Sequence, residues 1–414
     1  MKKRFIKSSL ILLTALLAMS GNAYSATPDQ LYDNVWSLIN KKYYDPTDNS
    51  QDWTRWRYKY ENKLKTKEDA YVAIETMLAS LDDPYTRFLD PKEFSEENQS
   101  IKGSLKGIGT QIGIRDGKLV IIAPLEDSPA ERAGLLADDE ILEINGESTK
   151  GISIDVAADK IRGEKGTTVT LLIKRKDVPN KSYSIVRDEI EVKSVSTKPP
   201  FETQIPEGIQ YIRLSSFISK NAAGEIETIL NNSADAKGYI IDLRSNPGGL
   251  LTNAIYISDM LLNGGVIVST VDRDSYKTTT RARKHQVTEK PVVILINKGS
   301  ASASEILSGA LKDNHRAVIV GEQSFGKGLV QEINRLPDEA GVNITIQRYL
   351  TPSGTDIHKK GITPDVVVEL KKENAEAKDD VQLKKAIEIL KEATCQGEKS
   401  GSLAEVNQKT LPNQ

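Results

Sequence analysis

The chain has 414 residues, and its 56 Lys and Arg against 58 Asp and Glu give a formal net charge of −2. This balance offers no general attraction to nucleic acid, and the length predicts two or three globular domains. Cys395 is the single cysteine, so no disulfide can form within the chain. No histidine or glycine-rich loop flanks it, and we therefore do not expect it to be a nucleophile.

The N-terminus has the pattern of an export signal. Basic residues are followed by an apolar run to Met19 and by Ala23 and Ser25 at the spacing that signal peptidase prefers. We expect residues 1–25 to be a signal peptide and the mature protein to work in the periplasm or an equivalent extracytoplasmic space. A membrane anchor is the alternative, but the apolar run is shorter than the roughly 20 residues that a membrane span needs.

Residues 26–100 are expected to form a helical N-terminal region. The stretches "LYDNVWSLINKKYY" and "EDAYVAIETMLASL" place apolar residues at helical spacing on either side of a turn-like "DPTDNSQDW". Between them, "DWTRWRYKYENKLK" interleaves aromatic and basic residues, which also occurs where proteins stack on single-stranded nucleic acid. No wider basic surface supports that function, so we favour an amphipathic helix.

Beyond residue 100 the pattern changes twice. Residues 101–188 contain short β-like runs separated by glycines, with one helical stretch, "DVAADKIRG", and predict a small β-rich domain. In residues 189–368, runs such as "KGYIIDLRS" and "PVVILIN" alternate with helical ones, which predicts an α/β sheet with functional residues at its strand ends. Residues 369–414 are expected to be a charged helix and a disordered tail. The fold class is therefore multidomain, combining α+β and α/β parts.

The stretch "KGSASASEILSGALKDN" raises the main functional question. It follows a strand and opens a helix, so Ser300, Ser302 or Ser304 lies where backbone N–H groups and the positive helix end point outward. A serine nucleophile at such a place has an oxyanion site beside it. Serine is also a common N-cap, and on this stretch alone we favour that role. The residues alone do not decide which serine would be the nucleophile.

A serine nucleophile needs a base that takes its proton. The three histidines have no evident acidic partner and no metal-site spacing; they are His285, His315 and His358. Lys327 fits better, because it stands between two glycines in the strand-turn segment "VIVGEQSFGKGLVQ". Burial would lower the pKa of a lysine there and let its neutral amine act as a general base, as in known Ser-Lys variants of the catalytic triad.

The serine and lysine motifs belong to a longer series of motifs along the chain. The series "IDLRSNPGGLL", "GSASASE", "IVGEQSFGKG" and "YLTPSGTDIHKKGITPD" closely resembles the carboxyl-terminal processing proteases, or tail-specific proteases, from about Leu31 to Val368. The resemblance implies that Ser302 is the nucleophile and Lys327 the general base. It gives Gln331 the role of orienting the lysine, one turn later if the segment is helical. Glu305, one turn after the serine, is either catalytic or part of the helix start.

The resemblance also implies a crotonase-like α/β protease core and an oxyanion hole. The N–H groups of Gly248, in "SNPGG", and Ala303 would stabilise the tetrahedral intermediate. Without the resemblance, an ordinary Pro-Gly turn would explain "SNPGG".

The β-rich domain resembles a PDZ domain, most clearly in "SPAERAGLLADDEILEING". N–H groups after Gly107, in the loop with Ile108 and Gly109, would hold a chain-terminal carboxylate while the tail adds to the sheet as a strand. Ile108, Ile112 and the helix "IDVAADKI" would form an apolar pocket, unless the two isoleucines are ordinary core residues. Arg162 is a candidate link between peptide binding and the protease core.

The expected function is an exported serine endopeptidase that recognises protein substrates by apolar C-terminal tails, with no metal, cofactor or nucleic acid. We expect no membrane span after signal cleavage, and a homodimer and an activating adaptor as further partners by family analogy. The alternatives are an inactive PDZ scaffold and a thioester enzyme of crotonase type, although no coenzyme A site is evident. The stretch "SLDDPYTRFLDPKEF" is also similar to relatives that mature a photosystem II protein, and does not separate them from bacterial envelope proteases.

Overall fold

The computed structural model describes residues 26–102, 104–115, 117–125, 128–136, 138–175, 178–191, 193–199, 203–371 and 379–397. The expected signal peptide and C-terminal tail lie outside these residues. Within the described ranges, no helix combines the length and the apolar character needed to cross a membrane. The mixed α/β multidomain class expected from the sequence is confirmed.

The N-terminal region consists of α1 (Pro28–Lys42), α2 (Trp53–Tyr58), α3 (Lys67–Ala79), β1 (Arg87–Leu89) and α4 (Pro91–Lys102). Capping boxes at Thr27 and Thr66 satisfy the free N–H groups at the starts of α1 and α3. The helix expected over "DWTRWRYKYENKLK" is much shorter than predicted. Only α2 forms, because the chain continues in turns after Tyr58 and reaches a positive φ of 59° at Asn62, which a continuous right-handed helix does not allow.

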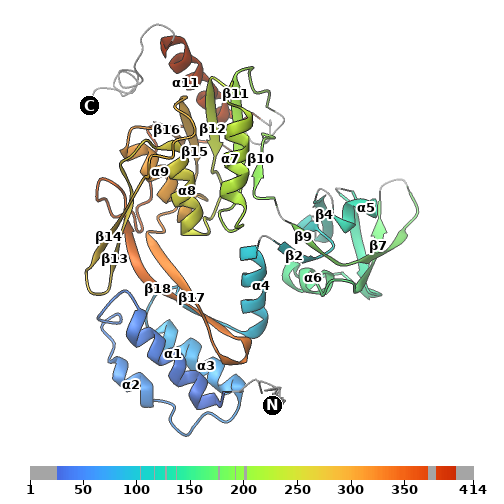
Figure 1. The fold of residues 1–414 in the computed structure, drawn as a ribbon. Helices are drawn as coiled ribbons and strands as arrows, with labels where there is room; N and C mark the ends of the chain where they lie inside the picture. Colours follow the sequence, from blue (N-terminus) through green and yellow to red (C-terminus); the bar gives the residue numbers. More distant parts are fainter. Residues whose placement is uncertain are drawn as a thin grey trace, which may run out of the picture.

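A five-stranded sheet supports these helices. Its order is β1, β18 (Gly341–Leu350), β13 (Val266–Asp272) and β14 (Lys277–Arg281), and β17 (Leu329–Arg335) also pairs with β18. β1 is antiparallel to β18, which lies about 250 residues later, with Phe88 opposite Val342. A short 3-10 helix, η2 (Pro337–Glu339), connects β17 to β18. Figure 1 shows this sheet between the N-terminal helices and the protease core.

The protease core is a six-stranded sheet in the order β10 (Val195–Ser196), β11 (Ile209–Leu214), β12 (Gly238–Asp242), β15 (Val292–Ile296), β16 (Ala317–Gly321) and β19 (Val366–Val367). All neighbours are parallel except β10 and β11. Helices α7 (Ala222–Asn232), α8 (Leu251–Leu261) and α9 (Ala303–Asp313) pack on one face, and α11 (Val381–Gly397) packs on the other. The expected alternation of strands and helices is confirmed.

The β-rich domain is joined to the rest by a two-stranded ribbon of β2 (Ser104–Gly107) and β9 (Asp188–Glu191). Its strands are β3 (Thr110–Arg115), β4 (Lys118–Pro124), β5 (Glu140–Ile144), β6 (Glu147–Ser148), β7 (Thr168–Lys174) and β8 (Lys181–Val186), and its helices are α5 (Pro129–Arg132) and α6 (Ile154–Ile161). It has its own apolar core. Figure 1 shows it projecting beyond α4, the helix that leads into the ribbon.

The C-terminal helix α11 belongs to the core of this chain. Leu383, Ala386 and Leu390 are buried against the sheet residues Ile240 and Val293. This packing buries the apolar face of α11 within this chain.

A buried ion-pair network fixes the start of α11 to the sheet. Arg244, which follows β12, donates hydrogen bonds to both Asp242 and Asp380, the latter at 2.7 and 2.8 Å. Asp242 and Asp380 are buried to 99% or more, so each charge depends on the others for solvation.

We predict that Asp380→Ala lowers the free energy of unfolding by about 3 kcal/mol, because it leaves part of the buried Arg244 charge uncompensated. Lys385→Ala is the control, since it removes an ion pair with Glu388 that is partly exposed, worth about 0.5 kcal/mol or less. Equilibrium denaturation measures both. Equal stability of the two variants would show that the network does not hold α11 in place.

Candidate active site

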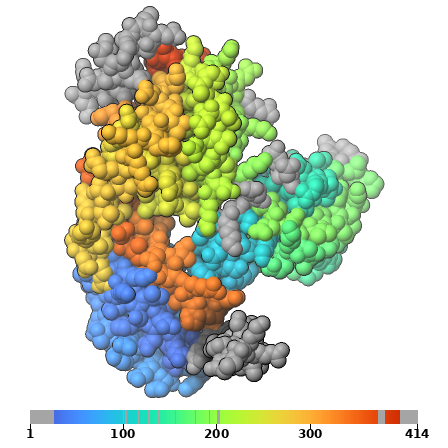
Figure 2. All heavy atoms as spheres, viewed as in Figure 1, coloured from blue at the N-terminus to red at the C-terminus, as the bar shows by residue number. Residues whose placement is uncertain are grey.

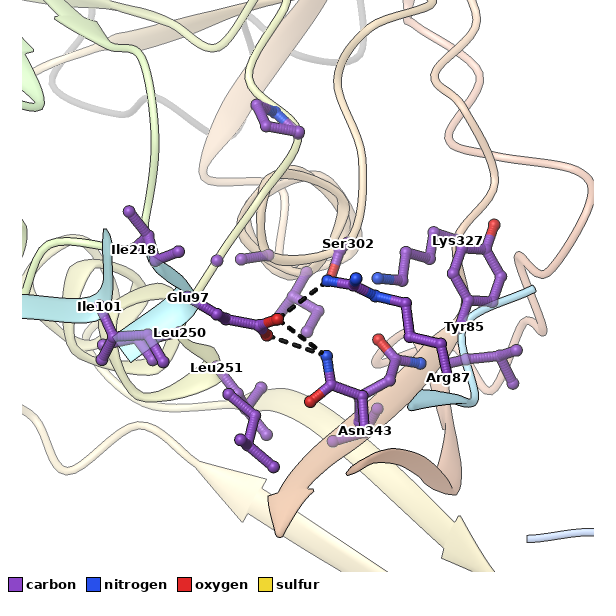
Figure 3. Close-up of a pocket in the computed structure, with 18 of the residues that line it drawn as sticks. Tyr85, Arg87, Glu97, Ile101, Ile218, Leu250, Leu251, Ser302, Lys327 and Asn343 are labelled. Carbon is purple, nitrogen blue, oxygen red and sulfur yellow. Dashed lines mark hydrogen bonds and ion pairs between the residues drawn. The ribbon is translucent and has the colours of Figure 1, made fainter. Parts of the chain in front are cut away.

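Three loops at the carboxyl ends of parallel strands meet at one cavity of about 330 Å³. The loop after β12 carries Gly248 and Gly249, the loop after β15 carries Ser302, and the loop after β16 carries Lys327. The lining includes Ser302, Ala303, Lys327 and Gln331. Figure 2 shows the surface hollowed between the core and α4, and Figure 3 shows the residues that line the cavity.

The structure separates the three serines that the sequence left equivalent. Ser300 and Ser304 are fully buried, and their hydroxyls donate to the carbonyls of Leu243 at 2.8 Å and Asn246 at 2.9 Å. Ser302 lines the cavity at the N-terminus of α9. Its φ of 54° is unusual for a residue with a Cβ and indicates backbone strain at this position.

Lys327 lies deep in the same cavity. Burial lowers the pKa of its ammonium group, while the nearby carboxylates of Asp83, Glu97 and Glu305 partly oppose this shift. Its Nζ lies 4.5 Å from the ring centroid of Tyr85. A lysine with these surroundings has a larger neutral fraction at a given pH than an exposed lysine.

Glu305 joins the serine segment to the lysine loop. Its carboxylate, 1% exposed, accepts hydrogen bonds from the N–H groups of Ser302 at 2.8 Å and Lys327 at 2.9 Å on Oε2. Its Oε1 accepts from the Ser324 hydroxyl and the Gly326 N–H, each at 2.6 Å. The side chain therefore holds the backbone of both candidate catalytic residues, which agrees with the structural role that the sequence left open.

The two expected oxyanion donors are placed differently. Ala303 is the first residue of α9 and lines the cavity. Gly248 lies against Ser302, because a Cβ added to it would come 2.8 Å from the serine Cβ. Its N–H, however, donates to the side-chain oxygen of the buried Asn246 at 2.9 Å.

Gln331 is part of strand β17, so the helical spacing considered from the sequence is wrong. The segment pairs with β18 along its length, and that pairing decides its conformation. Gln331 still lines the cavity, and its amide nitrogen lies 3.4 Å from the Thr345 hydroxyl.

The expected peptide-binding residues lie in the β-rich domain, away from this cavity. Ile108 is 1% exposed and belongs to the domain core, and Ile112 on β3 packs against that core. Gly107 ends β2. Gly109 has a φ of 72° and lies so close to Ser128 that a Cβ on residue 109 would come 2.4 Å from the serine Cβ. The loop is therefore tight, and its role in holding a terminal carboxylate stays a prediction.

Arg162 follows α6, and its guanidinium lies 3.8 Å from Glu96 on α4. The same helix contributes Glu97 and Ile101 to the cavity wall. A path of direct contacts therefore runs from the β-rich domain through α4 to the cavity.

Sequence reasoning missed a group of cavity residues from the N-terminal region and the second sheet: Tyr85, Arg87, Glu97 and Asn343. Their only sequence signal is the stretch "SLDDPYTRFLDPKEF", which contains the first two. Their role depends on the pairing of β1 with β18, which no local pattern reveals.

Comparison with known proteins identifies the family. The family model for peptidase family S41 matches residues 208–368, a PDZ domain model matches residues 120–175, and a tricorn protease C1 domain model matches residues 24–71. A carboxyl-terminal-processing protease of Synechocystis is 40% identical over 425 residues, covering 99% of each chain. The chain belongs to the carboxyl-terminal processing proteases. It is a serine-type peptidase with a PDZ domain.

Two further relatives extend this family assignment. A carboxy-terminal processing protease of Bacillus subtilis is 35% identical and covers 89% of this chain and 78% of its own. The solved structure of a photosystem II D1 C-terminal processing protease is 30% identical, with a TM-score of 0.58 and coverage of 88% of this chain and 97% of its own. The similarity to these processing proteases thus spans the N-terminal region, the PDZ domain and the protease core.

We predict that Glu305→Gln lowers kcat by about 100-fold, because a neutral amide cannot accept all four hydrogen bonds and the serine and lysine loops then shift. Peptide cleavage and thermal unfolding measure the effect. Glu227→Gln, at a partly exposed carboxylate on α7, is the control and should leave both unchanged. Unchanged kcat in Glu305→Gln would refute the positioning role.

Proposed function

We propose that this family member is an exported endopeptidase in which Ser302 is the nucleophile and Lys327 the general base. The observation that carries the proposal is the meeting of the two side chains in one cavity, the serine at a helix N-terminus and the lysine in surroundings that lower its pKa. Serine is a weak nucleophile without a base, and Lys327 would supply that base. Lysine is normally protonated, and the lowered pKa of Lys327 increases its neutral fraction.

The proposed reaction has two halves. Neutral Lys327 takes the proton of the Ser302 hydroxyl as the oxygen attacks a peptide carbonyl, and the tetrahedral intermediate collapses to an acyl-enzyme. The lysine ammonium gives its proton to the leaving amine. Water then attacks the ester with the lysine again as base, which releases the new carboxyl terminus and restores the free serine.

Stabilisation of the oxyanion is assigned to the N–H groups of Ala303 and Gly248. The Ala303 amide at the start of α9 supports its part of this assignment. The Gly248 amide must share or exchange its hydrogen bond to Asn246 before it can serve an oxyanion. Gln331 is proposed to orient Lys327 from the neighbouring strand.

The proposed substrates are proteins with apolar C-terminal tails that bind the PDZ domain. The exposed side chains of Ile154 and Val156 on α6 support an apolar tail-binding surface beside the Gly107–Gly109 loop. Maturation of a photosystem protein is the function in the name of one structural relative, and general processing of exported proteins is the alternative. Export itself is proposed from residues 1–25.

We predict that Ser302→Ala and Lys327→Ala each reduce cleavage of a loosely folded protein with an apolar tail by at least about 10³-fold. Amidation of the tail or an acidic last residue should weaken cleavage by the unsubstituted enzyme. Mass spectrometry of the products measures both. Retained cleavage in Ser302→Ala would refute the nucleophile, and tail binding without cleavage by the unsubstituted protein would favour a scaffold.

The proposed base also predicts a pH dependence. Only neutral Lys327 can accept the serine proton, so kcat/KM should rise with pH through the lowered pKa of this lysine and fall on acidification. Lys327→Arg should be as inactive as Lys327→Ala, because the guanidinium keeps its proton at every accessible pH. Activity that is independent of pH on the acidic side, or activity in Lys327→Arg, would contradict the assignment.

A further inference from the structure

The wall of the catalytic cavity contains an ion pair that the reaction scheme does not use. Arg87 on β1 donates from its terminal guanidinium nitrogen to Glu97 on α4 at 2.9 Å. Asn343 on β18 donates to both oxygens of the same carboxylate, at 2.9 and 3.2 Å. All three side chains line the cavity together with Ser302 and Lys327, as Figure 3 shows.

We propose that Arg87 and Glu97 are positioning residues that set the charge of the general base: Arg87 favours the neutral amine of Lys327, and Glu97 favours the ammonium ion. The proposal rests on the proposed role of Lys327 as base. It gives a reason for the two opposite charges in the wall of a cavity that would bind uncharged peptide bonds. Either charge alone would change the fraction of enzyme in which Lys327 is neutral and able to act as a base.

The physical basis is the opposite sign of the two charges, which line the same cavity as Lys327. A charged group beside a buried amine acts through a medium less polar than water, so a single unit charge changes the protonation equilibrium measurably. Arg87 lowers the pKa of Lys327 and Glu97 raises it. Because the two are hydrogen-bonded to each other, their effects on the lysine partly cancel in the intact pair.

The other charged or titratable groups near Lys327 come from different elements and are held independently. They are Asp83 and Tyr85, before β1, and Glu305 on α9. Asp83 accepts hydrogen bonds from the Tyr85 N–H and the Thr86 hydroxyl, and Glu305 accepts its four. Substitution of Arg87 or Glu97 therefore leaves these carboxylates with their present partners.

The two members of the pair differ in what fixes them. Arg87 is part of β1, which is paired with β18 in the five-stranded sheet. Glu97 lies on α4, which leads directly into the ribbon that carries the PDZ domain. Any variant or ligand that moves α4 would therefore move the negative charge and leave the positive one in place on β1.

The test is the pH dependence of kcat/KM for a fixed peptide substrate. Arg87→Gln should move the acidic limb to higher pH, because the base then binds its proton more tightly, and Glu97→Gln should move it to lower pH. Each shift is expected to be about half a pH unit to one unit. The double variant should return close to the unsubstituted enzyme, and Arg87→Lys, which keeps the charge, should leave the limb in place.

Lys92→Gln is the matched control. Lys92 is on α4, as Glu97 is, and forms an ion pair with Asp159 of α6, but it does not line the cavity. It should leave the limb unchanged. Opposite shifts in the two single variants support the proposal, because a purely structural pair would lose activity in both without moving the limb. Unmoved limbs in both, with Lys327→Ala inactive, would overturn the proposal and leave the Ser-Lys assignment intact.

A second readout does not depend on cleavage. In Ser302→Ala protein, the pH dependence of Lys327 acylation by an amine-directed reagent, located by mass spectrometry, reports the neutral fraction of the amine directly. The same opposite shifts are expected with Arg87→Gln and Glu97→Gln. Their absence would overturn the coupling. Cleavage retained by Lys327→Ala would instead refute the proposed base, whatever the labelling shows.

Discussion

The geometry of the candidate catalytic site depends on one buried carboxylate. Glu305 accepts four hydrogen bonds, and through them it ties the start of α9 to the loop that follows β16. A carboxylate that is 1% exposed is stable as an ion only with such partners. The requirement that this ion be solvated by backbone N–H groups therefore fixes Ser302 and Lys327 relative to each other, although 24 residues separate them in sequence.

The parallel sheet provides the second constraint. Because β12, β15 and β16 run in the same direction, the loops that follow them emerge at one edge. The buried network of Arg244, Asp242 and Asp380 closes the opposite face with α11. The second sheet then adds Arg87 and Asn343, and α4 adds Glu97, so the cavity is completed by parts of the chain that precede and follow the protease core.

Features that depend on local sequence patterns could be predicted, and features that depend on contacts between distant parts of the chain could not. Alternation of apolar strands and helices identified the core sheet, and a helix start after "PVVILIN" identified the segment of Ser302. The residues alone left Ser300, Ser302 and Ser304 equivalent, and only the family resemblance pointed to Ser302. The hydrogen bonds of Ser300 to Leu243 and of Ser304 to Asn246 are long-range contacts that the sequence does not reveal. Arg87 and Glu97 could not be found, because their neighbours depend on the pairing of β1 with β18. The conformation at Gln331 was left open by the sequence, because its pairing with β18 is also a tertiary contact.

The most direct test of the central claim, that a neutral Lys327 activates Ser302, is covalent labelling with a serine-directed fluorophosphonate, followed by peptide mass spectrometry across a pH series. The account predicts a single adduct on Ser302, with a labelling rate that rises with pH and is lost in Lys327→Ala. An adduct on another residue, or a rate on Ser302 that does not change with pH or with removal of the lysine, would contradict it.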